Sequence, residues 1–167
     1  VVLACRDFSS APIVLGGAGY SIFPQGALAF LEADMGIEGE GEVAFTTLLS
    51  HLENRQDLSG IAGLHIRGGG PARAQRRIEK LDGLLLPDAG ILSDSTAKNR
   101  EPWIPVQTRR GCALKCSYCS TPSIEGTTLR RRSPDLVAAW LERWGDDGFK
   151  NFFFVDNTFN LPPAYAK

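Results

Sequence analysis

The segment RRGCALKCSYCSTP, residues 109–122, contains three of the four cysteines of this 167-residue chain. Cys112, Cys116 and Cys119 are spaced four and three positions apart, whereas Cys5 lies far away in the sequence. The first residues, VVLACRDFSS, do not have the pattern of a signal peptide, so a reducing cytoplasmic location is expected. Disulfides are rare in that compartment, and the crowded thiols are therefore predicted to be metal ligands or catalytic groups.

The charge and hydropathy of the chain exclude two classes of partner. Eighteen basic residues against nineteen acidic ones give a net charge of -1, so no nucleic-acid partner is expected. The one basic run, Arg130 to Arg132, is interpreted as a solvated face. No apolar run approaches the roughly 20 residues that a membrane-spanning helix needs, which predicts no transmembrane segment.

Residues 1–81 alternate between strand and helix patterns, which is typical of an α/β fold. A short apolar run closed by Gly16 and Gly17 predicts a buried strand and a tight turn. Helical patterns are expected at 24–33 and 42–54, and strands at 11–17, 35–37 and 61–67. This alternation predicts a parallel sheet with ligands at the carboxyl ends of its strands.

Residues 103–167 predict a second α/β unit, joined to the first by a linker at 82–102. A strand at 103–108 runs into the cysteine loop, and a second strand is expected at 151–156. Between these two strands, Ser133 and Pro134 predict the start of a helix, and the serine side chain is expected to cap the free amides of that helix. One such unit cannot close a barrel, so the chain is expected to be a piece of a longer protein.

Three clustered thiols favour an iron–sulfur cluster over the other metal sites considered. A structural zinc site uses four ligands, and neither His51 nor His65 lies near the cysteines in sequence. Three thiolates can hold three irons of a [4Fe-4S] cube and leave the fourth iron open to a substrate. An electron-transfer module, which would need a fourth ligand, and a zinc site remain as alternatives.

The pattern Cys112-x-x-x-Cys116-x-x-Cys119, with Tyr118 before the last cysteine, resembles the signature of radical S-adenosylmethionine (SAM) enzymes. The flanking residues 110–111, 120–122 and 132–134 resemble the subgroup that carries an N-terminal cobalamin-binding domain. Residues 12–17, 20–24 and 39–42 are similar to the second half of that Rossmann-like domain. The resemblance implies a partial cobalamin-binding domain at 1–81 and the first βα units of a partial (β/α) barrel at 103–167.

The resemblance also implies a reaction. A [4Fe-4S] cluster held by the three cysteines would bind SAM and reductively cleave it to a 5'-deoxyadenosyl radical, with cobalamin as a further cofactor and methyl transfer as one outcome. The implied partners are an external one-electron donor and a small-molecule or lipid-like substrate. Because further barrel strands carry most substrate contacts in the family, this stretch alone is expected to be inactive.

Several other residues take roles from the resemblance. Tyr118, Asp156 and Asn157 are expected near SAM, although simple packing of Tyr118 and a turn cap by Asp156 are equally good explanations. Cys5 is expected to be a buried apolar residue. The residues expected near cobalamin are Gly16, Gly17, Ser21, Glu40 and Gly41, with turn geometry as the alternative for the two adjacent glycines.

Overall fold

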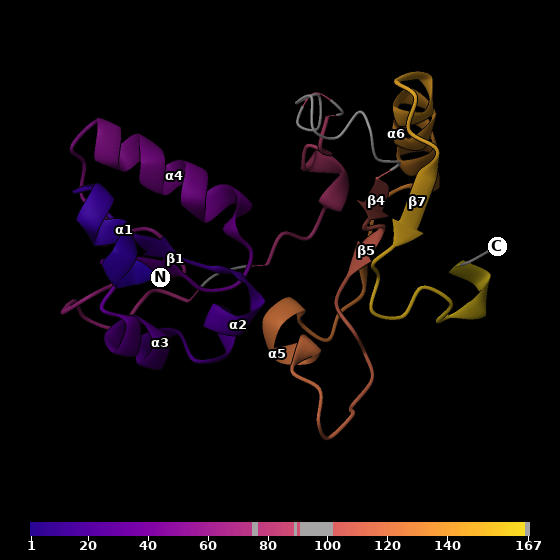
Figure 1. The fold of residues 1–167 in the computed structure, drawn as a ribbon. Helices are drawn as coiled ribbons and strands as arrows, with labels where there is room; N and C mark the ends of the chain where they lie inside the picture. The colour runs from indigo at the N-terminus through magenta and orange to yellow at the C-terminus, as the bar shows by residue number, and fades with distance from the viewer. Residues whose placement is uncertain (75–76, 89, 91–101, 166–167) are drawn as a thin grey trace. The chain divides into compact units, whose positions relative to one another are not determined.

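The computed structural model describes residues 1–74, 77–88, 90 and 102–165, and it shows a mixed α/β protein (Figure 1). The chain divides into two compact units. The first unit comprises Val1–Ile78 and Ser123–Glu125, and the second comprises Glu79–Pro122 and Gly126–Lys167.

The first unit is a three-stranded sheet in the order β1-β2-β3, with helices on both faces. The helix α4 lies on one face, and α2 and α3 lie on the other (Figure 1). The elements, in chain order, are α1 (Val2–Phe8), β1 (Val14–Leu15), α2 (Gly17–Ile22), α3 (Pro24–Leu31), β2 (Met35–Ile37), α4 (Gly41–Glu53) and β3 (Leu64–Ile66).

The sheet is mixed, so the prediction of a wholly parallel sheet is wrong for its third strand. β1 and β2 run parallel, but β3 is antiparallel to β2, with Leu64 opposite Ile37. The chain leaves α4 through a turn in which Leu58 and Ile61 pack against the core. It therefore enters β3 at the carboxyl end of β2 and runs back along it.

Side chains of β2 point alternately to the two faces of the sheet, as strand geometry requires. Met35 and Ile37 pack with Ala44 and Leu48 of α4, and Leu48 is fully buried. Gly36 faces the other side, where the ring of Tyr20 from α2 lies so close that a Cβ at position 36 would overlap it. A glycine is thus required for α2 to pack on β2.

The second unit contains two small sheets and one long amphipathic helix. β4 and β7 run parallel, with Trp103 opposite Asn151, and β5 pairs antiparallel with β6. The strands β5 and β6 and the short helix after the cysteines were not predicted. The elements are η1 (Leu81–Gly83), β4 (Trp103–Val106), β5 (Arg109–Arg110), α5 (Thr121–Glu125), β6 (Arg130–Arg131), α6 (Pro134–Asp146), β7 (Asn151–Phe154) and η3 (Pro163–Tyr165).

The core of the second unit lies between α6 and the β4–β7 pair. Val137, Trp140 and Trp144 of α6 are buried against Ile104 and Val106 of β4. The two tryptophan rings lie 5.2 Å apart.

The described part of the predicted linker, 82–88 and 90, differs from the expectation because it packs against α6. The Pro87 carbonyl accepts hydrogen bonds from the indole nitrogens of Trp140 at 2.7 Å and Trp144 at 3.2 Å. Asp82 accepts a hydrogen bond from the Ser133 amide at 2.8 Å. Ser133 makes no side-chain cap of its own, so the predicted cap is wrong. Residues 89 and 91–101 lie outside the described residues.

The run Arg130 to Arg132 is not a solvated face, contrary to the prediction. Arg130 is 7% exposed and Arg132 is 6% exposed. The Arg132 guanidinium donates to the carbonyls of Leu81 at 2.6 Å and Leu84 at 3.0 Å, which holds the 81–84 turn against β6. Buried carbonyls that accept these charged donors explain why the arginine is inside.

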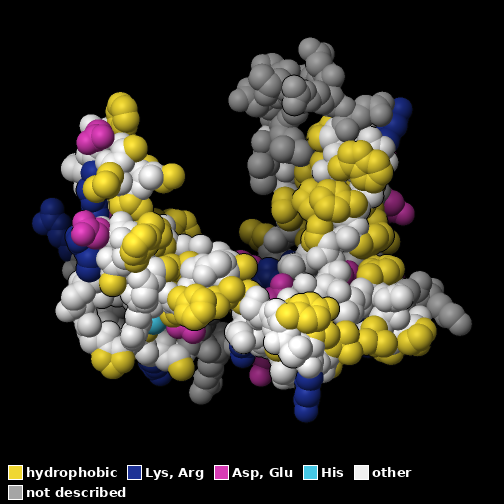
Figure 2. All heavy atoms as spheres, turned by 60° about the horizontal axis from the view of Figure 1, so that its bottom comes forward, with side chains coloured by type: hydrophobic (Ala, Val, Ile, Leu, Met, Phe, Trp, Pro, Cys, Tyr) yellow, Lys and Arg dark blue, Asp and Glu magenta, His cyan; other side chains and the backbone are white. Residues whose placement is uncertain are grey.

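Large apolar side chains remain exposed on both units, and apolar groups are visible across the surface in Figure 2. Val43, Phe45 and Leu49 of α4 are exposed in the first unit, and Phe153 and Phe154 of β7 in the second. Where such side chains form a contiguous surface, it usually marks a place where further protein packs. No helix among the described residues has both the length and the apolar character needed to cross a membrane.

The Tyr20–Gly36 contact predicts opposite effects for two glycine substitutions. Gly36→Ala should destabilise the first unit by about 1–3 kcal/mol, because the new methyl group displaces the buried Tyr20 ring. The matched control is Gly26→Ala in α3, where a Cβ meets nothing within 4 Å. This change should stabilise the protein by about 0.5–1 kcal/mol. Urea denaturation followed by circular dichroism measures both, and equal effects would contradict the packing argument.

Candidate cofactor sites

The cysteine loop leaves β5 through a glycine that cannot be replaced without strain. Gly111 has a φ of 91°, and a Cβ there would overlap the carbonyl oxygen of Thr128. The next residue, Cys112, is buried, and its amide donates to the Gly126 carbonyl at 3.0 Å. The first cysteine is therefore fixed against the segment that follows α5.

The other two cysteines lie on an exposed turn. Residues 113–120 are exposed, and the Cys119 amide donates to the Cys116 carbonyl at 3.2 Å. Within the described ranges, no three Cys, His, Asp or Glu side chains are grouped closely enough to hold a metal ion. Three thiols in one short loop nevertheless form a donor set that suits an iron–sulfur cluster. The exposed turn leaves room for the sulfurs to converge.

The thiol of Cys119 is prepared for ionisation. Hydrogen bonds from the side chain and the backbone of Thr121 lower the pKa of Cys119 below its ordinary value. The thiolate is the form that binds metals. Thr121 begins α5, so the short helix after the loop contributes to the chemistry of its last cysteine.

Tyr118 projects into solvent, with 91% of its surface exposed. Simple packing, which the sequence left as an alternative role for this ring, is therefore not what the structure shows. Cys5 also differs from the expectation: it is exposed on α1 rather than buried. It belongs to the first unit, so the second unit contains three cysteines and no fourth.

Asp156, the residue after Val155 at the end of β7, caps backbone amides at the end of the neighbouring strand. Its carboxylate accepts hydrogen bonds from the Thr108 amide at 2.8 Å, the Arg109 amide at 3.1 Å and the Thr108 hydroxyl at 2.5 Å. The turn-cap role that the sequence left open is thus present. Asn157 is exposed beside it.

Thr108 and Arg109 were not predicted to matter, yet they connect β4 to the cysteine loop. They are 5% and 2% exposed. The Arg109 guanidinium donates to the Thr158 hydroxyl at 2.6 Å and also to the Leu161 carbonyl. The sequence did offer one signal for this connecting role, because Arg109 stands between an apolar strand and the glycine before Cys112. Its partners lie about 50 positions away, however, and the local pattern does not reveal them.

In the first unit, the residues predicted for cobalamin gather where β1 and β2 end. Ser21 of α2 donates its hydroxyl hydrogen to the Gly17 carbonyl and accepts from the Gly39 amide, both at 2.9 Å. This hydroxyl therefore joins the glycine turn after β1 to the turn after β2. Gly17 has a φ of 86°, which favours glycine at that turn.

Glu40 and Gly41 belong to the same turn, but the Glu40 side chain is directed into the unit. Glu40 is 8% exposed and accepts a hydrogen bond from the Ile78 amide at 2.7 Å. Beside this turn, the His65 ring nitrogen lies 2.8 Å from the Glu38 carboxylate. Burial, together with the charge of Glu38, raises the pKa of Tyr20 to about 12. Neither Glu38 nor His65 was a predicted site residue.

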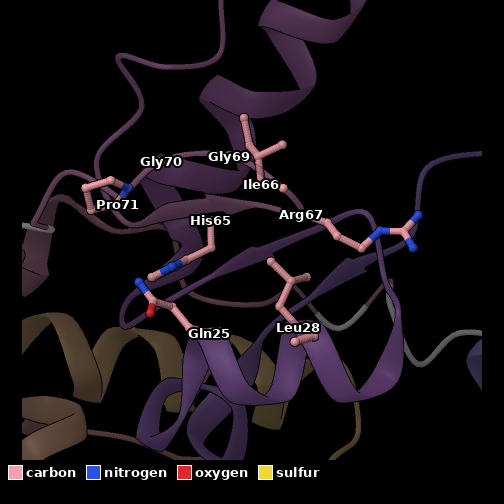
Figure 3. Close-up of a pocket in the computed structure, with 10 residues that line it drawn as sticks. Gln25, Leu28, His65, Ile66, Arg67, Gly69, Gly70 and Pro71 are labelled. Atoms are coloured by element: carbon pink, nitrogen blue, oxygen red, sulfur yellow. The ribbon is translucent and has the colours of Figure 1, made fainter.

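A cavity of about 340 Å³ lies between α3 and β3. Gln25 and Leu28 of α3 and His65 of β3 line it, together with the glycine-rich turn after Arg67 (Figure 3). None of the predicted cofactor residues lines this cavity. It is therefore distinct from the edge where Ser21 joins the two turns.

Comparison with known proteins finds relatives that are methyltransferases, although no family model matches the chain. An uncharacterised methyltransferase of Pyrococcus horikoshii is 30% identical over 157 residues, which is 89% of this chain and 34% of that protein. The cobalamin-dependent radical SAM methyltransferase TokK of Streptomyces tokunonensis is 28% identical over 78% of this chain and 20% of its own length.

A solved structure shows the same fold. The radical SAM methyltransferase TsrM of Kitasatospora setae matches 99% of this chain and 33% of its own, with a TM-score of 0.76 and 23% sequence identity. The chain thus spans about a third or less of the length of these relatives. These sequence relatives agree with the three-cysteine signature, and the chain is homologous to cobalamin-dependent radical SAM methyltransferases.

Proposed function

We propose that this chain is part of a cobalamin-dependent radical SAM methyltransferase. The observation that carries the proposal is the loop with Cys112, Cys116 and Cys119 at the end of a strand, in a chain whose relatives include cobalamin-dependent radical SAM methyltransferases. Active groups of α/β proteins usually lie at such strand ends.

The three cysteines would hold a [4Fe-4S] cluster, with Tyr118 and Asn157 near the SAM that binds to it. When bound, the cluster would supply the electron that cleaves SAM to a 5'-deoxyadenosyl radical. Cys112 would anchor the cluster from its buried position, while the exposed turn carries Cys116 and Cys119 toward it. The hydrogen bonds from Thr121, which lower the pKa of Cys119, would favour the thiolate form that binds metals.

The first unit would be the carboxyl-terminal part of a Rossmann-like cobalamin-binding domain. Its candidate binding edge is formed by Gly16, Gly17 and the 39–41 turn, with the Ser21 hydroxyl joining them. Glycines at this edge let the backbone approach a large cofactor closely. Glu40 would act through the backbone of its turn, because its side chain is buried.

The second unit would be the beginning of a (β/α) barrel. The parallel β4–β7 pair with α6 between them is the repeating unit of such a barrel. Trp103, Phe153 and Phe154 are exposed on these strands, and further strands and helices would cover them. An external one-electron donor and a small-molecule or lipid-like substrate would complete the reaction.

An electron-transfer module is a weaker candidate, because it would need a fourth cluster ligand from the protein, whereas the clustered cysteines supply three. The two functions separate in one experiment on the intact protein, reconstituted without oxygen with iron, sulfide and cobalamin. Release of 5'-deoxyadenosine or S-adenosylhomocysteine from SAM under reducing conditions is expected. A bound cluster that leaves SAM intact would contradict the proposed function.

Replacing any one of the three clustered cysteines by alanine should remove most of the bound iron. Each thiolate would hold a different iron, and two thiolates anchor a cluster too weakly to survive purification. The control is Cys5→Ala, which should keep the full iron and sulfide content. Iron and sulfide analysis after anaerobic reconstitution measures this. One zinc per chain, or equal iron loss in the control, would contradict the cluster assignment.

Ser21→Ala should weaken cobalamin binding about fivefold, because loss of the hydrogen bond from the Gly39 amide, worth about 1 kcal/mol, frees the two turns from each other. Ser50→Ala on α4 is the control, since its exposed hydroxyl accepts from Asn54 at the end of the same helix. Titration of the intact protein with cobalamin, followed by visible absorbance, gives both affinities. Equal affinities of the two variants would place the cobalamin site elsewhere.

A further inference from the structure

We propose that Asp156 is a positioning residue that fixes the start of the cysteine loop, and that it is not a ligand of SAM. This inference rests on the proposed function, because the loop that Asp156 fixes is the proposed cluster loop. It replaces the role that the family resemblance implies for this residue. The evidence is the arrangement of hydrogen bonds where β4 and β7 end.

The parallel ladder between β4 and β7 stops just before this point. Val106 lies opposite Phe154, and the Val155 amide donates to the Val106 carbonyl at 3.0 Å. Thr108 and Arg109 lie beyond the end of this ladder, so β7 offers no paired residue opposite their amides. Buried amides need acceptors, and the Asp156 side chain supplies them to both residues.

The carboxylate has little capacity left for another charged partner. A carboxylate offers about four lone-pair positions. In Asp156, Oδ1 accepts from both amides, and Oδ2 accepts from the Thr108 hydroxyl at 2.5 Å. An ammonium group of SAM would have to compete with these hydrogen bonds. Their donors are almost completely buried, because Thr108 is 5% exposed and Arg109 is 2% exposed.

The contact is reciprocal, which makes it a clamp. The side chain after β7 holds the backbone at 108 and 109, and the Arg109 side chain holds Thr158 and Leu161 of the segment after β7. The Thr108 carbonyl also accepts from the Arg132 amide at 2.8 Å. The backbone three residues before Cys112 is thereby held from two neighbouring segments, so its direction sets where the cysteine loop begins.

Four substitutions separate positioning from direct binding. Asp156→Asn keeps an oxygen for the two amides and an amide group that can donate to the Thr108 hydroxyl, but it removes the charge. Asp156→Ala removes the clamp entirely. Thr108→Val removes one hydrogen bond at nearly constant shape, and Thr108→Ser keeps that bond. All four are tested in the intact, anaerobically reconstituted protein, by iron content and by the change that SAM causes in the electron paramagnetic resonance spectrum of the reduced cluster.

If Asp156 positions the loop, Asp156→Asn and Thr108→Ser should bind iron and respond to SAM like the wild type. Asp156→Ala should lower cluster affinity about tenfold or more, the usual cost of removing a group that orients metal ligands, and Thr108→Val should lower it to a smaller degree. Conservative rescue by asparagine is the decisive result. If Asp156→Ala does not fold, the other three variants still decide.

Direct binding predicts the opposite pattern. Asp156→Asn would then keep its full iron content and lose the spectral response to SAM, and Thr108→Val would behave like the wild type. That result would overturn the inference and leave the proposed function intact. A wild-type protein that binds no iron–sulfur cluster would instead refute the proposed function, and with it the clamp's role.

Discussion

Backbone amides that flank a β-ladder, before its first residue or after its last, must find acceptors, and acidic side chains from distant segments meet this need in both units. Asp34 accepts the Ile13 amide at 2.7 Å in the first unit, and Asp156 accepts two amides in the second. The hydrogen bond from the Ile13 amide, together with the hydrogen bond from Arg6, also holds the pKa of Asp34 below its ordinary value. An unpaired buried amide costs free energy comparable to a lost hydrogen bond, so the strand ends depend on these carboxylates.

The same constraint explains why the candidate cofactor residues lie where they do. Ser21 satisfies the Gly39 amide and thereby brings two glycine turns to one edge of the first sheet. In the second unit, Asp156 fixes the backbone that leads to Cys112. In each unit, a polar side chain beside a strand end joins two turns, and those turns carry the residues predicted to meet a cofactor.

Sequence reasoning succeeded where the signal is local. The strand at 35–37, the helix after Glu40 and the helix that begins after Ser133 follow from patterns within a few residues, and the three-cysteine spacing is itself a local pattern. It failed where the partner is distant. The direction of β3, the packing of Pro87 on the two tryptophans and the burial of Arg132 depend on contacts 27 to 57 positions apart, which neither propensity nor spacing encodes.

The cysteine loop combines a fixed start with an adaptable end. Gly111 and Cys112 are buried, and the Cys112 amide is hydrogen-bonded to the segment after α5, whereas residues 113–120 are exposed. Metal binding commonly supplies the free energy that orders such a segment, because a preformed site would crowd thiolates of like charge. In the proposed site, the exposed residues 113–120 would become ordered only when the cluster binds. The rigid junction at Gly111 and Cys112 would then set the position of the cluster from the side of β4 and β7.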